Sequence, residues 1–229
     1  MLGWIMHQAG RDPTIMNGAV MKNFVSPDVP FASARVGKGP VFVSEVDESD
    51  GSIALYRPAV AVLLNVSLDH KGLAELRVLF GDLLAAAPRV AVNLDDPESA
   101  VLAARAREVV GFGIEATDAR ISVDAWSGSA LGIVATVIDR ENSSSHELAL
   151  AMPGRHNLAN ALAAIAGAAA AGVSVAEAVA ALATPPDLLG VVPGVLVLPQ
   201  PAADDLVTRA CVAGDVDALD ECGVAGGVK

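Results

Sequence analysis

The sequence predicts an α/β fold in which a mostly parallel sheet is flanked by helices and carries a small antiparallel β annex. Apolar runs of β-branched residues that do not alternate with polar ones are typical of strands buried on both faces of a sheet. Stretches of helical periodicity lie between these runs, as the crossover helices of a parallel sheet do. The 229 residues are 53% hydrophobic but only 3% aromatic. Such an alanine- and valine-rich composition suits helices that cover a sheet.

The first half of the chain alternates strands and helices. The expected elements are a helix over 2–9, strands over 41–43 and 59–66, a helix over 71–86, a strand over 89–93, a helix over 97–107 and a strand over 108–112. Gly10 stands where a helix C-terminus favours glycine. Because the chain opens inside a helix that no strand feeds, we expect that a segment upstream of Met1 is missing.

The pattern changes after residue 119. Residues 120–126 alternate, 133–139 are β-branched and 147–151 are short and apolar, which predicts an antiparallel meander. A long alanine-rich helix over 155–171 follows. Ser174 and Glu177 then form the capping box of a second helix, which ends near Thr184.

We therefore expect one domain over residues 1–184 and an atypical, poorly ordered tail over 185–229. The tail holds both cysteines, Cys211 and Cys222, and is rich in proline and aspartate. Two thiols form neither a metal cage nor a disulfide framework, and we interpret them as free thiols in a reducing compartment.

The charge balance excludes several classes of partner. Lys and Arg total 15 against 27 Asp and Glu, a formal net charge of -12, so no basic surface is available for nucleic acid. The longest apolar run, 163–171, is about half the roughly 20 residues that a membrane span needs. Residues 1–10 lack the basic opening of a secretory signal. These features predict a soluble, cytoplasmic protein with no membrane or nucleic-acid partner.

An acidic segment follows the strand expected at 41–43. Glu45, Asp47, Glu48 and Asp50 place four carboxylates within six residues. Ligands of α/β sheets bind at the carboxyl ends of the strands, and Mg²⁺ prefers oxygen ligands, so the segment is a candidate magnesium site. A solvated acidic turn is the alternative.

A second polar segment, NVSLDH over 65–70, follows the strand expected at 59–66. His70 stands near the start of a helix, where it is placed to contact a metal ion or a phosphate. A surface histidine without function is the alternative. Because neighbouring strands bring their ends together, we expect the two polar segments to meet.

A third segment, PGRHNLAN over 153–160, leads into the long helix. Asn157 and Asn160 are three residues apart and share a helix face, which offers a pair of amides to a purine base. His156 is placed to pack against the face of that base. The alternative is that Asn157 caps the helix. The stretch VGKGP over 36–40 is rejected as a phosphate-binding loop, because no hydroxyl residue follows Lys38 and no helix is expected after it.

Together the three segments resemble motifs of the Mur ligase family, most closely those of the branch that joins L-alanine to UDP-N-acetylmuramate. Their order and spacing agree with that branch, and residues 1–23 resemble the segment that follows the family's ATP-binding loop. The resemblance covers 1 to about 184. It implies an ATP-dependent ligase of peptidoglycan precursor synthesis that works through an acyl phosphate, with ATP and Mg²⁺ as cofactors and a UDP-sugar and an amino acid as substrates.

The resemblance also implies roles for single residues. Glu45 binds Mg²⁺ near the γ-phosphate and His70 supports a second Mg²⁺, which makes these two the candidate catalytic residues. The remaining candidates contact the adenine (His156, Asn157 and Asn160) or lie near the nucleotide-sugar (Asp47, Glu48 and Asp50).

Two departures from the family pattern lead us to expect an incomplete form with weak or no ligase activity. The family's ATP-binding loop would precede Met1, and its amino-acid-binding domain would follow the helix that ends near Thr184; we interpret the tail as unrelated to that domain. Two alternatives stay open. One is a ligase of the same superfamily with another substrate, of the folate or cyanophycin type. The other is a non-catalytic nucleotide-binding remnant.

Overall fold

The computed structural model describes residues 1–46, 49, 51–67, 71–183 and 210–215. Within them, ten strands form one sheet in the order β2-β1-β3-β10-β4-β5-β6-β7-β8-β9. The strands are β1 (Thr14–Met16), β2 (Ala34–Arg35), β3 (Val41–Val46), β4 (Val60–Leu63), β5 (Arg89–Asn93), β6 (Val109–Phe112), β7 (Ile121–Ser129), β8 (Gly132–Asp139), β9 (Ser144–Leu150) and β10 (Ala210–Asp215). The α-helices are α1 (Leu2–Gln8), α2 (Leu73–Ala86), α3 (Pro97–Leu102), α4 (Arg155–Ala170) and α5 (Val175–Ala183). Short 3₁₀ turns span Lys22–Phe24, Ser52–Leu55 and Ala103–Arg105.

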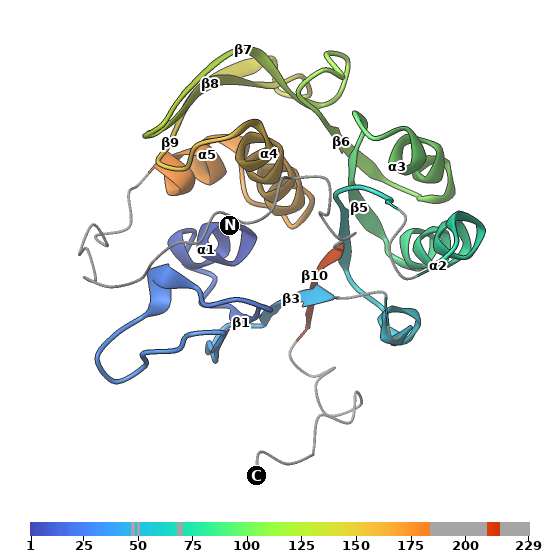
Figure 1. The fold of residues 1–229 in the computed structure, drawn as a ribbon, viewed down its shortest axis with the longest axis horizontal. Helices are drawn as coiled ribbons and strands as arrows, with labels where there is room; N and C mark the ends of the chain where they lie inside the picture. Colours follow the sequence, from blue (N-terminus) through green and yellow to red (C-terminus); the bar gives the residue numbers. More distant parts are fainter. Residues whose placement is uncertain (47–48, 50, 68–70, 184–209, 216–229) are drawn as a thin grey trace.

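Helices cover both faces of the sheet, and the alternation of side chains along the strands shows which face each residue serves. In β4, Val60 and Val62 join a core with residues of α1, α4 and α5, whereas Ala61 and Leu63 join a core with residues of α2. Figure 1 shows α1, α4 and α5 inside the curve of the sheet and α2 and α3 outside it. The sequence-predicted α/β class is therefore confirmed.

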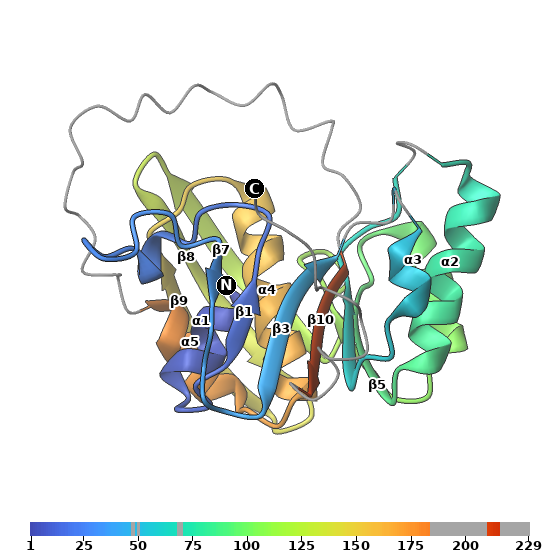
Figure 2. The ribbon, with the colours of Figure 1, turned by 90° about the horizontal axis from the view of Figure 1, so that it is seen from below.

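Strand directions also agree with the prediction. The pairs β1–β3, β4–β5, β5–β6 and β6–β7 are parallel. The pairs β7–β8 and β8–β9 are antiparallel and form the predicted meander, with a register shift between Val123 and Ala125. β10 pairs antiparallel with both β3 and β4, and Figure 2 shows it beside β3.

Most predicted elements appear with bounds within a few residues, and β5 has the bounds predicted for it. The helix predicted over 97–107 is shorter, because α3 ends at Leu102 and a 3₁₀ turn continues to Arg105. The sequence predicted neither the short strands β1 and β2 nor β10, which comes from the tail. The boundary near residue 184 stays a prediction, since residues 184–209 lie outside the described part.

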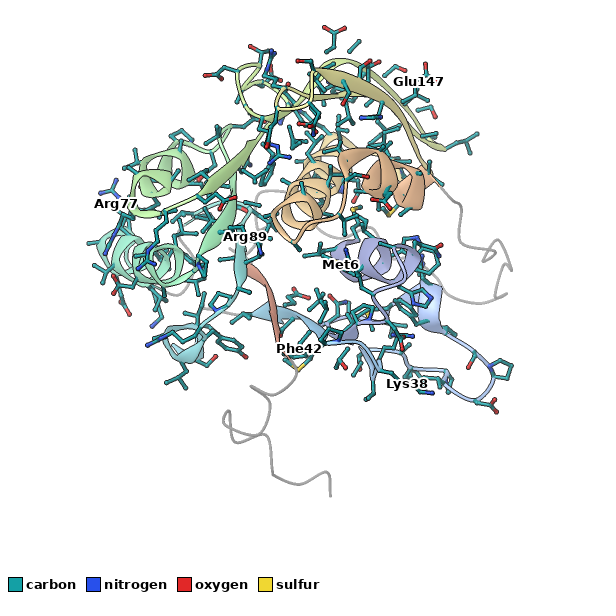
Figure 3. The ribbon with its side chains drawn as sticks, turned by 180° about the vertical axis from the view of Figure 1, so that it is seen from behind. Met6, Lys38, Phe42, Arg77, Arg89 and Glu147 are labelled. Carbon is teal, nitrogen blue, oxygen red and sulfur yellow. The ribbon has the colours of Figure 1, made fainter. Side chains whose placement is uncertain are left out.

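The helix α1 ends as its sequence predicts. Gly10 has φ +72°, the left-handed conformation that glycine tolerates, and its N–H donates to the carbonyl of His7 at 3.0 Å. The indole N–H of Trp4 donates to the carbonyl of Ala181 at 3.0 Å and so ties α1 to α5. Figure 3 shows Met6 in the interior and Arg77 and Glu147 at the periphery. Among the described helices, none has the length and apolar character of a membrane span.

The capping box before α5 is confirmed and carries a first prediction. The Ser174 hydroxyl accepts from the Glu177 backbone N–H at 3.2 Å, and the Glu177 carboxylate accepts from the Ser174 N–H at 3.1 Å. We expect Ser174→Ala to lower the free energy of unfolding by about 1 kcal/mol, because one helix donor loses its partner. Urea denaturation followed by circular dichroism measures this. The control is Ser145→Ala, on β9, and an equal loss in both variants would contradict the assignment.

An ion pair near the start of β1 carries a second prediction. Arg35 Nη2 lies 2.5 Å from Asp12 Oδ1. The hydrogen bond from Arg35, followed by that from the Lys38 backbone N–H, holds the pKa of the Asp12 carboxyl below its ordinary value. The pair therefore stabilises the fold above the pKa that Asp12 has in the unfolded chain, and this contribution is lost as pH falls through the lowered pKa.

We expect Arg35→Met to raise the pKa of Asp12 toward its ordinary value, with part of the shift retained because the Lys38 N–H remains. Titration of the Asp12 carboxyl carbon by NMR measures this. Glu98, whose pKa is lowered chiefly by a hydrogen bond from Arg77, serves as the internal reference and stays unchanged. An Asp12 pKa that does not move would show that Arg35 is not the main cause.

Candidate functional site

The carboxyl ends of four central strands lie along one edge of the sheet. β4, β5 and β6 are parallel, and β3 points the same way as β4 because both pair antiparallel with β10. We call this the carboxyl edge, defined by the residues that end or follow β3, β4, β5 and β6. The edges formed by the carboxyl ends of parallel strands are where α/β proteins bind ligands.

Glu45 is the penultimate residue of β3 and is partly buried. Because successive side chains of a strand point to opposite faces of the sheet, Glu45 lies on the face opposite to Ser44 and on the same face as Val43. Val43 packs in the core with residues of α1, α4 and α5. Its Oε2 accepts a hydrogen bond from the Gly18 backbone N–H at 3.0 Å. A Cβ at Gly18 would lie 3.4 Å from this oxygen, in ordinary van der Waals contact, so the loop after β1 lies against the carboxylate.

Of the candidate ligands for magnesium, only the carboxylate of Glu45 lies within the part of the chain that the structure describes. Among the described residues, no group of three His, Cys, Asp or Glu side chains is placed to hold a metal ion. Magnesium commonly takes one or two carboxylates from the protein and fills its other positions with water and phosphate oxygens. The carboxylate of Glu45 fits that pattern.

The other acidic candidates and the histidine of the second segment lie outside the described residues; they are Asp47, Glu48, Asp50 and His70. The expectation that the first two segments follow adjacent strands is wrong, because β10 lies between β3 and β4. Described residues of the second segment bond to one another, since the Asn65 amide donates to the Ser67 hydroxyl at 3.3 Å.

The third segment forms the start of α4, where His156 and Asn157 lie in the first turn. Gly154 has φ +97°, and a Cβ there would lie 2.6 Å from His156 Cε1, so the imidazole folds back over the glycine. The Asn157 amide donates to the Pro153 carbonyl at 2.7 Å. Gly154, not Asn157, occupies the N-cap position, and no side chain caps it. The alternative that Asn157 caps the helix is therefore wrong, and Asn160 lies one turn further along.

A further polar segment, residues 93–96, begins with the last residue of β5 and lies at the same edge, although the sequence did not single it out. The Asn93 amide donates to the Leu64 carbonyl at 2.9 Å, and the Asp96 carboxylate accepts from the Val66 N–H at 3.2 Å. The segment therefore ties the end of β5 to the chain that follows β4. The signal was present in the sequence, since NLDD stands at the carboxyl end of a predicted strand as the two polar segments already singled out do.

The rejected phosphate-binding loop is confirmed to lead into a strand. Residues 36–40 precede β3, and the Gly37 N–H donates to the Thr14 hydroxyl at 3.1 Å. A hollow of about 400 Å³ lies at this amino end of β3, with Arg11, Lys38 and Val41 in its lining. It is at the opposite end of the strand from Glu45. Hollow size alone does not mark the site here, because the polar residues that the sequence singled out gather at the other edge.

Comparison with known proteins agrees with this geometry. The family model described as the Mur ligase middle domain matches residues 29–168. A UDP-N-acetylmuramate--L-alanine ligase of Nocardia farcinica is 35% identical over 202 residues, covering 80% of this chain and 39% of the relative. The corresponding ligase of Gloeobacter violaceus is 36% identical over 170 residues, covering 72% of this chain and 35% of the relative. The chain thus spans between a third and two fifths of these curated relatives.

Solved structures show the same relationship. The UDP-N-acetylmuramate-alanine ligase of Thermotoga maritima matches with a TM-score of 0.66 and 25% identity, covering 79% of this chain and 40% of that one. A UDP-N-acetylmuramate:L-alanyl-gamma-D-glutamyl-meso-diaminopimelate ligase from Neisseria meningitides matches with a TM-score of 0.65 and 25% identity, covering 80% of this chain and 60% of that one.

Proposed function

Because this chain belongs to the Mur ligase family, we propose that its carboxyl edge binds a magnesium nucleotide for a ligase of peptidoglycan precursor synthesis. The observation that carries the proposal is the placement of two chemically different groups. Glu45 is the penultimate residue of β3 and lies on the face that α4 covers. The first turn of α4 contacts the carboxyl edge through an ion pair between Arg155 and Glu115, which follows β6. A carboxylate for the metal and a polar helix turn for the base thus flank one edge.

Each candidate residue has a role in this proposal. Glu45 holds Mg²⁺ by its carboxylate, and the ion, when bound, offsets the negative charge of the phosphates. His156 stacks on the adenine. The Asn160 amide and the amide oxygen of Asn157, whose nitrogen donates to the Pro153 carbonyl, bond to its polar edge. The residues outside the described part keep the roles that the resemblance implies: His70 supports a second Mg²⁺, and Asp47, Glu48 and Asp50 lie near the nucleotide-sugar.

The proposed reaction of the full ligase joins L-alanine to UDP-N-acetylmuramate in two steps. The muramyl carboxylate attacks the γ-phosphorus of ATP, ADP leaves, and an acyl phosphate forms. The amine of L-alanine then attacks the acyl carbon, inorganic phosphate leaves with the C–O electron pair, and the nitrogen loses a proton as the amide forms. Charge builds up on phosphate oxygens in the first step, which is where positioned cations contribute most.

Calorimetric titration of the purified chain with Mg-ATP and Mg-GTP tests nucleotide binding. We expect ATP to bind more tightly than GTP, and His156→Ala and Asn160→Ala to reduce this preference. His146→Ala is the matched control, because His146 lies on β9 and pairs with Ser144 rather than with the carboxyl edge. A chain that binds neither nucleotide, or binds both equally, would contradict the proposal.

Phosphate release with UDP-N-acetylmuramate and ATP tests the acceptor. The curated relatives named above favour L-alanine, whereas the Neisseria structure is named for a tripeptide. Any phosphate release should be far slower than that of a full-length ligase, and we expect it to respond to L-alanine and not to L-alanyl-γ-D-glutamyl-meso-diaminopimelate. The reverse response would assign the chain to the tripeptide branch. ATP binding without release with either acceptor would favour a nucleotide-binding role for this chain.

A further inference from the structure

Asp95 holds the loop that follows β6 by its carboxylate. The two carboxylate oxygens accept hydrogen bonds from three consecutive backbone N–H groups, those of Ile114 at 2.7 Å, Glu115 at 3.0 Å and Ala116 at 2.7 Å. Successive backbone N–H groups of this kind form a concave anion-binding nest. The Asp95 side chain is 15% exposed. We call Asp95 with these three N–H groups the Asp95 clasp.

The loop is shaped around this carboxylate. A Cβ at Gly113 would lie 2.5 Å from Asp95 Oδ1 and 3.0 Å from its Cγ. Any side chain at position 113 would therefore occupy the place of the Asp95 carboxyl group. The glycine and the clasp together fix where the backbone of Glu115 lies.

The clasp is connected to α4 through Glu115. The Glu115 carboxylate accepts from Arg155 Nη2 at 3.0 Å, and the same nitrogen lies 4.0 Å from Asp95 Oδ2. Arg155 is the first residue of α4 and precedes His156 and Asn157. His156 lies against Gly154 and the Asn157 amide donates to the Pro153 carbonyl, which are local contacts, whereas the contact of Arg155 extends to the carboxyl edge.

We propose that Asp95 is a positioning residue for the nucleotide base, an inference that rests on the proposed function. Asp95 fixes Glu115, and the two carboxylates orient Arg155 and with it the first turn of α4. The turn has no side-chain cap of its own, so an external contact decides how His156 and Asn157 are presented. Asp95 acts through Arg155 and does not touch the ligand.

The test measures how much of the affinity depends on the base. Mg-ATP and magnesium tripolyphosphate are titrated into the unchanged chain and into Asp95→Asn and Arg155→Gln. We expect both variants to lose about tenfold in ATP affinity, the lower end of what removing an orienting partner costs a binding site, and to keep their affinity for tripolyphosphate. Arg155→Lys, which keeps the charge, should recover part of the loss. Asp82→Asn, an exposed carboxylate paired with Arg105, is the matched control and should lose neither.

A double-mutant cycle separates positioning from a general loss of stability. In the Arg155→Gln chain, Asp95→Asn should cause no further loss of ATP affinity, because the connection is already broken. Additive losses would overturn the inference. If Asp95→Asn does not fold, Arg155→Gln alone decides, since Arg155 is 51% exposed and its removal leaves the clasp intact.

The titrations distinguish a failure of the proposed nucleotide site from a failure of the proposed positioning role of Asp95. If the unchanged chain binds ATP and Arg155→Gln binds it equally well, the positioning role of Asp95 is wrong and the nucleotide site stands. If the unchanged chain binds no ATP, the proposed function is wrong. The NMR signals of the His156 ring in the ligand-free chain then decide the structural part: a shift in Arg155→Gln supports the connection, and unchanged signals overturn it.

Discussion

Phe80→Ala is expected to lower the free energy of unfolding by about 3–5 kcal/mol, the cost of removing a fully buried phenylalanine. Phe80 lies on α2 and is 0% exposed. It packs in the core between α2 and the sheet, together with Leu63 of β4 and Val90 and Val92 of β5. Truncation leaves a cavity that these neighbours fill only in part, because they belong to strands fixed by pairing on both sides.

Urea denaturation measures this loss, and Val78→Ala is the matched control. Val78 lies on the same helix and is 58% exposed, so its truncation should change stability by no more than about 0.5 kcal/mol. Phe80 packs on the face of the sheet opposite to the one that α4 covers. We therefore expect the folded fraction of Phe80→Ala to keep its affinity for Mg-ATP. Equal losses in the two variants would show that α2 is not packed as described.

The central strands could be predicted from sequence because their own residues carry the signal. The three central residues of β5, Val90, Ala91 and Val92, are buried on both faces and form an uninterrupted apolar run, and the predicted bounds of the strand agree with the observed ones. The strands β1 and β2 have three and two residues and are too short to show a period. β1 forms because Ile15 is buried against Gly3 of α1 and because Thr14–Met16 pair with β3. β2 forms by pairing with β1, and no local pattern contains these contacts.

β10 shows the same limit more strongly. Its sequence, ACVAGD, contains glycine and small residues and has no strand-like alternation. What defines it as a strand is pairing with β3 and β4, which lie about 170 and about 150 residues earlier in the chain. Because β10 lies between β3 and β4, the two strands that precede the acidic segment and the NVSLDH segment are not adjacent, contrary to what the sequence had led us to expect.

The candidate site was predicted in part for a comparable reason. Glu45 follows a recognisable strand, and the rule that ligands bind at strand ends was enough to single it out. Asp95 also follows a strand of the sheet, but it is not part of the three segments that resemble family motifs. Its importance comes from three backbone N–H groups about 20 residues later in the chain, and such contacts appear only when the sheet is folded.

Glu45→Gln is expected to lower the affinity for Mg-ATP by about tenfold or more, as the loss of a metal ligand or its partner does. Glutamine has the same size, and its amide oxygen can still accept the hydrogen bond from the Gly18 N–H that Glu45 accepts at 3.0 Å. The substitution therefore removes the negative charge and keeps the local structure. We expect little change in the urea midpoint.

The dependence on magnesium distinguishes a metal ligand from a residue with only a structural role. When ATP is titrated at increasing Mg²⁺ concentration, the unchanged chain should gain affinity, and Glu45→Gln should gain much less. Glu75→Gln is the matched control, because Glu75 is an exposed carboxylate of α2 that pairs with Lys71. This substitution should leave the magnesium dependence unchanged. If Glu45→Gln responds to magnesium as the unchanged chain does, Glu45 does not hold the ion. The carboxylate at the end of β3 would then serve only to fix the loop that contains Gly18.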